Sequence, residues 1–381
     1  GNIPLVTNDL NISPKLGVYG ILDQITLSSQ KTKNVIESVR HYGRFLASYL
    51  PNVSSKQEAL GHMSATSGMV PNNNLQQKTF AANVNGSDAT NRNFRGNSFC
   101  INLPTGFLMS REKISLSGRG GGIGGLELSC HLSPDSQFLN GSWTNAFYQL
   151  TDVNLVCEVV NPSPDELSRM MSQTSATMEY NAISSYYQTI ASSNAIINFR
   201  LGLSRVLGVF MSFIPSVALN NLSYDGYQTT PLLNNLATQE IAPIKQVIFT
   251  RGGERLPLMY NLDANVRDDA DSTISDPQIV RNLVNSFQNF MKTIKTQQSP
   301  ITNDRVDGGG TALTQYADAG KMFGVGVAFD NISGEGLDFR TENFGVQMET
   351  GLTADVPHSA FLFVRSKQTL VMKANGLQVI Q

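Results

Sequence analysis

The chain has 381 residues, a formal net charge of −2 at pH 7 and only 15% charged residues. So nearly neutral a chain is neither a strongly basic nucleic-acid-binding protein nor an acidic tail. Its length predicts two domains of ordinary size, and its hydrophobic content of 40% excludes a disordered chain because it can form two cores.

The first half opens with a predicted strand at residues 18–27, followed by a predicted helix at residues 34–50. Asn34 is a suitable N-cap, and Glu37, three residues later, would complete a capping box. Apolar residues recur at spacings of three and four along the helix, which predicts one buried face. We expect Pro51 to end this helix.

A polar segment at residues 52–97 is rich in Asn, Gln, Ser and Gly and predicts a long surface loop. After it, alternating and apolar runs predict strands that complete the first domain. These strands are expected at residues 99–104, 113–116, 126–132 and 148–160, with a glycine-rich loop at 118–125. Pro162 and Pro164 should stop the last strand, because proline cannot donate a ladder hydrogen bond.

The second half begins with strand-like residues 178–203 and a short amphipathic segment at 205–213, which ends at Pro215. Strands are then expected at 244–250 and 255–260. The adjacent glycines between them, within Arg251-Gly252-Gly253-Glu254, favour a primed hairpin turn.

The clearest helix pattern of the chain covers residues 277–294, with Asp276 as N-cap and Pro277 at the first helical position. Beyond it, alternation predicts strands at 323–329, 346–350, 360–365, 370–374 and 377–380. The Asn375-Gly376 pair predicts a final hairpin in which Ala374 lies opposite Leu377 and Met372 opposite Val379.

The two halves repeat one order of elements: a strand, a helix, a polar loop and then several strands. This order predicts an all-β protein of two similar units, each with one helix in a long loop, in the manner of sandwiches or jelly rolls. We place the first unit at residues 1–165 and the second at 166–381. The first has fewer residues before its helix, and the chain does not begin with Met, so we interpret its N-terminal part as trimmed or incomplete.

Three cysteines, Cys100, Cys130 and Cys157, lie in predicted strands. Their odd number and the lack of a C-x-x-C spacing argue against a disulfide framework or a zinc site. We interpret them as small buried side chains. The most apolar stretch, residues 195–214, contains two arginines and a glycine, so we expect no membrane-spanning helix.

Several passages of the sequence resemble the double jelly-roll major capsid proteins of tailless icosahedral viruses and phages. The likeness lies in residues 25–30 and 35–37, 103–106 and 126–128, 148–162, and 361–379. By its length the chain is more similar to the compact phage members than to the larger eukaryotic-virus ones. The loop at 52–97 and the short start of the first unit depart from the family pattern.

The resemblance implies a fold of two tandem jelly-roll barrels and a structural role. It implies homotrimers that form pseudo-hexagonal capsomers and tile an icosahedral shell. Partners would then be neighbouring capsomers and other virion proteins, such as penton or minor capsid proteins. An internal membrane beneath the shell is a further partner that the family suggests. Loops 52–97, 217–240 and 295–320 would reach neighbouring subunits, and no sequence-specific nucleic-acid binding is expected.

Three loops carry patterns that are found in ligand sites. Gly120-x-Gly122-x-x-Gly125 matches a dinucleotide-binding pattern but precedes a strand, so it is interpreted as a turning loop. Residues 251–254 are interpreted as a hairpin turn. The carboxylates of Asp268, Asp269 and Asp271 lack the calcium-loop spacing and are interpreted as solvated, with metal bridging between subunits left open.

No nucleophile elbow or set of catalytic partners is found, so an enzyme is not expected, and no catalytic, cofactor or metal residue is assigned. The alternative function is a two-domain β-sandwich that binds carbohydrate in host attachment. It predicts exposed aromatic side chains on one face, for which Tyr186, Tyr187, Tyr224 and Tyr227 are the candidates. Trp143, the sole tryptophan, is interpreted as a packing residue.

Overall fold

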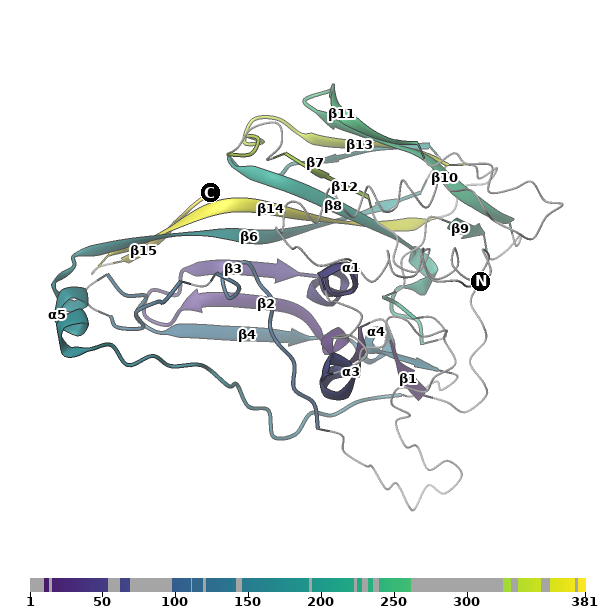
Figure 1. Ribbon diagram of the computed structural model, residues 1–381. Coiled ribbons are helices and arrows are strands. Elements are labelled where there is room, and N and C mark those ends of the chain that lie inside the picture. Colours follow the sequence, from purple (N-terminus) through teal and green to yellow (C-terminus); the bar gives the residue numbers. More distant parts are fainter. Residues whose placement is uncertain are drawn as a thin grey trace, which may run out of the picture.

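A computed structural model gives the fold (Figure 1). It describes residues 10–13, 16–53, 62–68, 98–110, 112–118, 121–141, 146–191, 194–222, 225–227, 232–235, 240–261, 325–329, 335–350, 357–373 and 376–381. The predicted helix at 277–294, the loop at 295–320, the three aspartates near 270 and Trp143 lie outside these residues.

Two long antiparallel strands, β6 (Ser175–Ile190) and β14 (His358–Lys373), are central to the fold. They pair over their whole length, from His358 opposite Ile190 to Lys373 opposite Ser175. The other edge of β14 pairs with β8 (Val206–Pro215) at one end and β15 (Gly376–Ile380) at the other, and β12 (Val325–Ala328) pairs with β8. The long pair is therefore extended by β8 and β12 at one end and by β15 at the other (Figure 1).

A second sheet has the order β11-β10-β13-β7, with β9 paired to β10. Its strands are β7 (Asn194–Phe199), β9 (Leu232–Asn235), β10 (Glu240–Arg251), β11 (Glu254–Asn261) and β13 (Phe344–Thr350). The first hydrophobic cluster joins this sheet to β8, β12 and half of β14, and Phe249 stacks on Phe344 within it. Two antiparallel sheets packed over one apolar core form a sandwich.

The N-terminal residues form a third sheet of order β3-β2-β4. It consists of β2 (Leu22–Ser29), β3 (Val35–Arg40) and β4 (Leu126–Leu132). Leu27 and Ile36 from this sheet share a buried cluster with Met178 of β6, Leu370 of β14 and Leu377 of β15. The C-terminal strands thus complete the core of the N-terminal sheet.

Helices lie at one end of this third sheet (Figure 1). They are η1 (Gly17–Ile21), α1 (Tyr42–Val53), α3 (His62–Ser67) and α4 (Asp135–Phe138), next to a two-stranded pair of β1 (Leu10–Ile12) and β5 (Leu139–Gly141). The remaining helices among the described residues are α5 (Pro164–Ser172) and η2 (Ser216–Ala218). α1 buries Tyr42, Phe45 and Leu46 in a cluster that includes Phe361 and Phe363 of β14.

The predicted helix at 34–50 is wrong in its first half. Residues Val35–Arg40 form β3, whose Val39 lies opposite Ile25 of β2, and the helix begins only at Tyr42. His41 separates the two elements with a φ of 53°, a left-handed turn conformation. Tertiary pairing overrides the local capping pattern here. The helix also continues past Pro51 to Val53.

Three other predicted strands, at 99–104, 113–116 and 148–160, form no regular strand. The three cysteines are consequently exposed and not buried, because Cys100 and Cys157 lie in these segments and Cys130 lies on an outer strand, β4. The segment at 18–27 begins as the 3-10 helix η1 and becomes a strand only at Leu22, and the segment at 205–213 belongs to strand β8.

Both predicted hairpins exist. Arg251 lies opposite Glu254, and Gly252 and Gly253 both have positive φ, as a primed two-residue turn requires. In the C-terminal hairpin the register differs from the prediction by two residues, because Met372 lies opposite Leu377 and Leu370 opposite Val379. Lys373 pairs with Gly376, so the glycine is the first paired residue and does not occupy the turn.

Candidate interaction surface

Glu37 is the most enclosed carboxylate among the described residues, with 4% of its surface exposed. Its Oε1 accepts hydrogen bonds from the backbone N–H groups of Gly106 at 3.0 Å and Ile183 at 2.8 Å, and its Oε2 accepts one from Phe107 at 2.8 Å. Burial raises the pKa of Glu37, although the hydrogen bonds from Phe107, Ile183, Thr105 and Gly106 oppose that shift. The carboxylate therefore joins β3, β6 and the loop at 105–110.

Gly106 allows this loop to approach β6. A Cβ atom at residue 106 would lie 1.8 Å from the carbonyl oxygen of Asn181 and 2.7 Å from its carbonyl carbon. Both obstacles are backbone atoms of a paired strand, so they cannot move aside cheaply. The loop around Glu37 thus requires glycine at this position.

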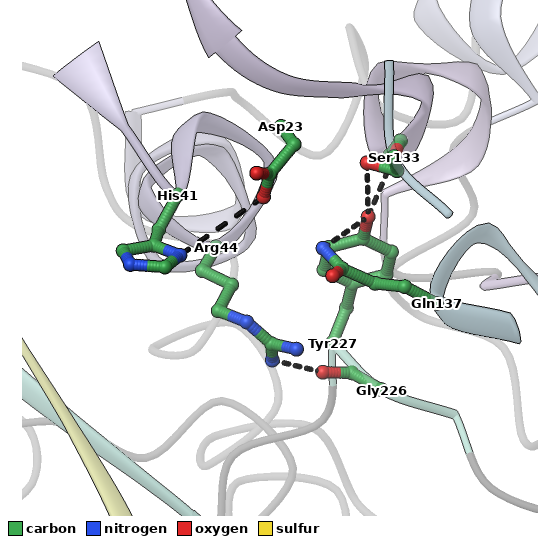
Figure 2. A network of polar contacts seen from close by, with 8 residues as sticks. Asp23, His41, Arg44, Ser133, Gln137, Gly226 and Tyr227 are labelled. Carbon is green, nitrogen blue, oxygen red and sulfur yellow. Dashed lines mark hydrogen bonds and ion pairs between the residues drawn. The ribbon is translucent and has the colours of Figure 1, made fainter. Parts of the chain in front are cut away.

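A second buried network joins α1 to residues 225–227 (Figure 2). The Tyr227 hydroxyl donates to the carbonyl oxygen of Gly20 and accepts from Nε2 of Gln137 at 3.2 Å, and it lies 3.3 Å from Oγ of Ser133. Nη1 of Arg44 donates to the carbonyl oxygen of Gly226. Burial raises the pKa of Tyr227, so its hydroxyl stays protonated and available as a donor.

The Arg44 guanidinium is buried between two aromatic rings. It lies 4.7 Å from the centroid of Phe361 and 5.6 Å from that of Tyr227. Burial lowers the pKa of Arg44, and the aromatic faces offset part of that desolvation. His41 lies near the same network, with Nδ1 4.0 Å from Asp23, and burial lowers its pKa (Figure 2). These contacts fix the packing of α1.

A partly open cavity of about 390 Å³ lies between α1, the loop at 106–112, β6 and β14. Its walls are aromatic, from Phe45, Tyr49 and Phe363, and charged groups from Glu179 and Arg365 also line it. Glu179 is already paired with Arg205 at 3.1 Å and with Lys367 at 2.6 Å. Because the lining is both aromatic and charged and Glu179 is already paired, the cavity does not indicate one class of ligand.

The most unusual surface feature is an extended segment, residues 149–161, which we call the arm. Every residue in it is exposed. Val156 is 90% exposed, Val159 77% and Val153 76%. Figure 1 draws this segment as a plain coil that runs below the third sheet and leads into α5. Exposed apolar side chains gathered in one segment are typical of an interaction site on a folded protein.

The start of the arm is anchored, and its end leads into α5. At its start, the Tyr148 hydroxyl donates to the carbonyl oxygen of Ser133, and its ring lies 4.9 Å from that of Phe138. At its end, Ser163 and Glu166 form a capping box at the start of α5. α5 itself buries no residue and exposes Leu167 and Met171. The apolar surface thus continues from the arm onto this helix.

Strand β4 provides an open edge. Among the described strands it pairs only with β2. Cys130, His131 and Leu132 at its far end are exposed. Open edges of this kind can pair with a further strand.

The structure separates the tyrosines considered for carbohydrate binding. Tyr227 is fully buried, and Tyr186 donates to the carbonyl oxygen of Leu201 and packs against the first cluster. Tyr187 is 44% exposed, and Tyr224 lies outside the described residues. The described tyrosines therefore form no exposed aromatic face. The exposure of the arm is not predicted from the sequence, because the alternation at residues 148–160 predicts a strand that pairs within the chain.

Within the described ranges, no group of three His, Cys, Asp or Glu side chains gathers closely enough to hold a metal ion. None of the helices in the same residues combines the length and apolar character needed to cross a membrane. The described part of the glycine loop, residues 121–125, packs against Lys31 and Gln30 and precedes β4. No described helix begins there, in agreement with its interpretation as a turning loop.

No protein-family model and no curated protein matches this sequence. Solved structures do match its fold. The Faustovirus major capsid protein aligns with a TM-score of 0.54 and 10% identity, over 97% of this chain and 74% of its own. The quasi-atomic model of the PBCV-1 virus capsid aligns with a TM-score of 0.50 and 10% identity, over 99% and 87% of the two chains.

A third structure, PBCV-1 VP54 fitted into a reconstruction of the virophage Sputnik, aligns with a TM-score of 0.50 and 12% identity, over 100% and 90% of the two chains. The chain therefore has the all-β double jelly-roll fold of major capsid proteins, which confirms the fold class and the resemblance that the sequence indicated.

Proposed function

We propose that this chain, which has the fold of the viral major capsid proteins, is itself a major capsid protein that assembles into a virion shell. The observation that carries the proposal is the likeness to capsid structures over 97–100% of the chain. A protein of this kind acts through its geometry, so we assign it no catalytic activity. Its place would be the virion capsid, assembled in the host cell.

We further propose that the assembling unit is a homotrimer of pseudo-hexagonal outline, and that such trimers tile an icosahedral shell. Two tandem barrels in each of three copies present six similar units around one axis, which accounts for such an outline. We keep the boundary near residue 165 as the proposed division between the barrels. Further partners would be neighbouring capsomers, penton or minor capsid proteins and an internal membrane.

The low net charge supports a coat that does not contact nucleic acid directly. Only 28 Lys and Arg residues stand against 30 Asp and Glu residues in the whole chain. Neutralising phosphates requires a surplus of basic side chains. Direct sequence-specific nucleic-acid binding is therefore not part of the proposal.

The test is the mass of the purified protein in solution, measured by light scattering over a wide concentration range, together with negative-stain imaging. We expect a stable trimer with a hexagonal outline, or shell fragments. A monomer at every concentration would overturn the proposal.

A further inference from the structure

We propose that the arm of one copy adds as a β-strand to the open edge of β4 in a second copy. The proposal rests on the proposed function, because it names the contact that joins copies of the chain. It assigns a role to a segment that the isolated chain leaves exposed.

The arm has the side-chain pattern of a strand. Val153, Leu155, Cys157 and Val159 occupy alternate positions, so an extended backbone places all four on one face. No described strand pairs with the arm, and no backbone hydrogen bond joins it to the described part of the chain. The arm therefore offers unpaired backbone donors and acceptors together with an apolar face, which is what an added strand needs.

The acceptor has the same period. Leu126, Leu128, Cys130 and Leu132 alternate along β4, and the far edge of this strand is open among the described strands. A strand added at this edge would continue the face that these residues form. The arm and the β4 edge occur on the same chain, so the arm of a second copy can pair with the β4 edge of the first.

The tethering of the arm favours this exchange. The segment is held at Tyr148 and is followed by α5, after which the chain enters β6 at Ser175, so less chain entropy is lost when it pairs than for a free tail. Its 13 residues span roughly 43 Å when extended, more than enough to follow the seven residues of β4.

A donor-to-acceptor contact is heterologous, because two different surfaces meet. Such contacts close into rings when the rotation between copies permits. Three copies, each giving its arm to the next, would form a closed ring with threefold symmetry. The proposal therefore agrees with the proposed trimer and explains why the arm is apolar although it is exposed in the single chain.

The first experiment is cross-linking between copies with a short bifunctional thiol reagent. One copy carries Cys100→Ser and Cys130→Ser, which leaves only the arm thiol, Cys157. The other carries Cys100→Ser and Cys157→Ser, which leaves only Cys130 on β4. Because all three cysteines are exposed, these changes should leave the fold intact, which circular dichroism can check. We expect a cross-linked pair in the assembled mixture and much less with either copy alone.

The second experiment is hydrogen exchange on the unmodified protein, comparing the assembled and the diluted forms. Strand pairing should slow exchange of the arm amides by about tenfold or more in the assembly. The variant Val153→Lys with Val159→Lys should remain folded but fail to assemble. Its matched control is Ile196→Lys, which changes an apolar side chain that is 68% exposed on β7 and should assemble normally.

The outcomes separate the two proposals. If the protein assembles while the arm amides exchange freely and the arm variant still assembles, the arm proposal is overturned and the capsid proposal stands. Arm amides already protected in the monomer would show pairing within one chain and also overturn it. A monomer under all conditions would overturn both.

Discussion

Oε2 of Glu37 accepts a hydrogen bond from the backbone N–H of Phe107 at 2.8 Å, across 70 residues of sequence. The same carboxylate accepts two further backbone hydrogen bonds, so one buried side chain satisfies three donors from two distant segments. Replacing this carboxylate therefore tests how the N-terminal sheet is attached to β6.

Glu37→Ala is expected to lower the free energy of unfolding by about 3–5 kcal/mol, because it leaves buried N–H groups without an acceptor. Glu37→Gln keeps one acceptor oxygen and should cost less. Urea denaturation provides the measurement. Glu127→Ala is the matched control, because this exposed carboxylate is paired with Lys33 and should cost less than about 1 kcal/mol. An equal loss in Glu37→Ala and Glu127→Ala would contradict the assigned role.

The stability should also depend on pH through Glu37. Its pKa in the folded state is raised above the ordinary value of 4.5, so the folded protein binds more protons than the unfolded chain above pH 4.5. The contribution of Glu37 is fully present below pH 4.5 and is lost as the pH rises through the folded pKa. The difference in unfolding free energy between the wild type and Glu37→Gln should therefore fall with rising pH, and a flat difference would refute the raised pKa.

Gly106→Ala is expected to destabilise the fold by about 3 kcal/mol or more, because the added methyl group meets the backbone of β6. The control is Gly376→Ala, where a Cβ atom meets no other atom within 4 Å. This control should change the stability by less than about 0.5 kcal/mol. Thermal and urea unfolding of both variants check the prediction, and similar stabilities for the two would show that the loop at residue 106 can move away from β6.

The sequence predicts features whose cause is local. Gly252 and Gly253 form the predicted primed turn because both adopt positive φ, which is a property of glycine itself. The local spacing from Asn34 to Glu37 predicts a helix cap. The hydrogen-bond partners of Glu37 lie 69 to 146 residues away, where no periodicity can reveal them. Residues 35–40 form a strand in place of the predicted helix for a related reason, because their pairing partner β2 cannot be read from the local pattern.

The sequence predicts the strand character of the arm but not its partner. Alternation at residues 148–160 does describe a segment with the character of a strand, but it does not say which edge that segment meets. The prediction placed the partner within the chain, whereas the structure leaves Val153 and Val156 exposed. A pattern of side chains specifies a face, and only the arrangement of whole strands specifies the partner.

Tyr227→Phe tests the buried network at α1. The change removes the hydroxyl that donates to Gly20 and accepts from Gln137, and leaves the Gln137 amide short of an acceptor (Figure 2). We expect a loss of about 1–3 kcal/mol in unfolding free energy. The matched control, Tyr187→Phe, changes a tyrosine that is 44% exposed, where water can replace the lost hydrogen bonds, and should cost less than about 1 kcal/mol. If both variants unfold at the same urea concentration, the Tyr227 hydroxyl adds nothing to the attachment of residues 225–227. That attachment would then rest on the packing of Arg44 between the Tyr227 and Phe361 rings.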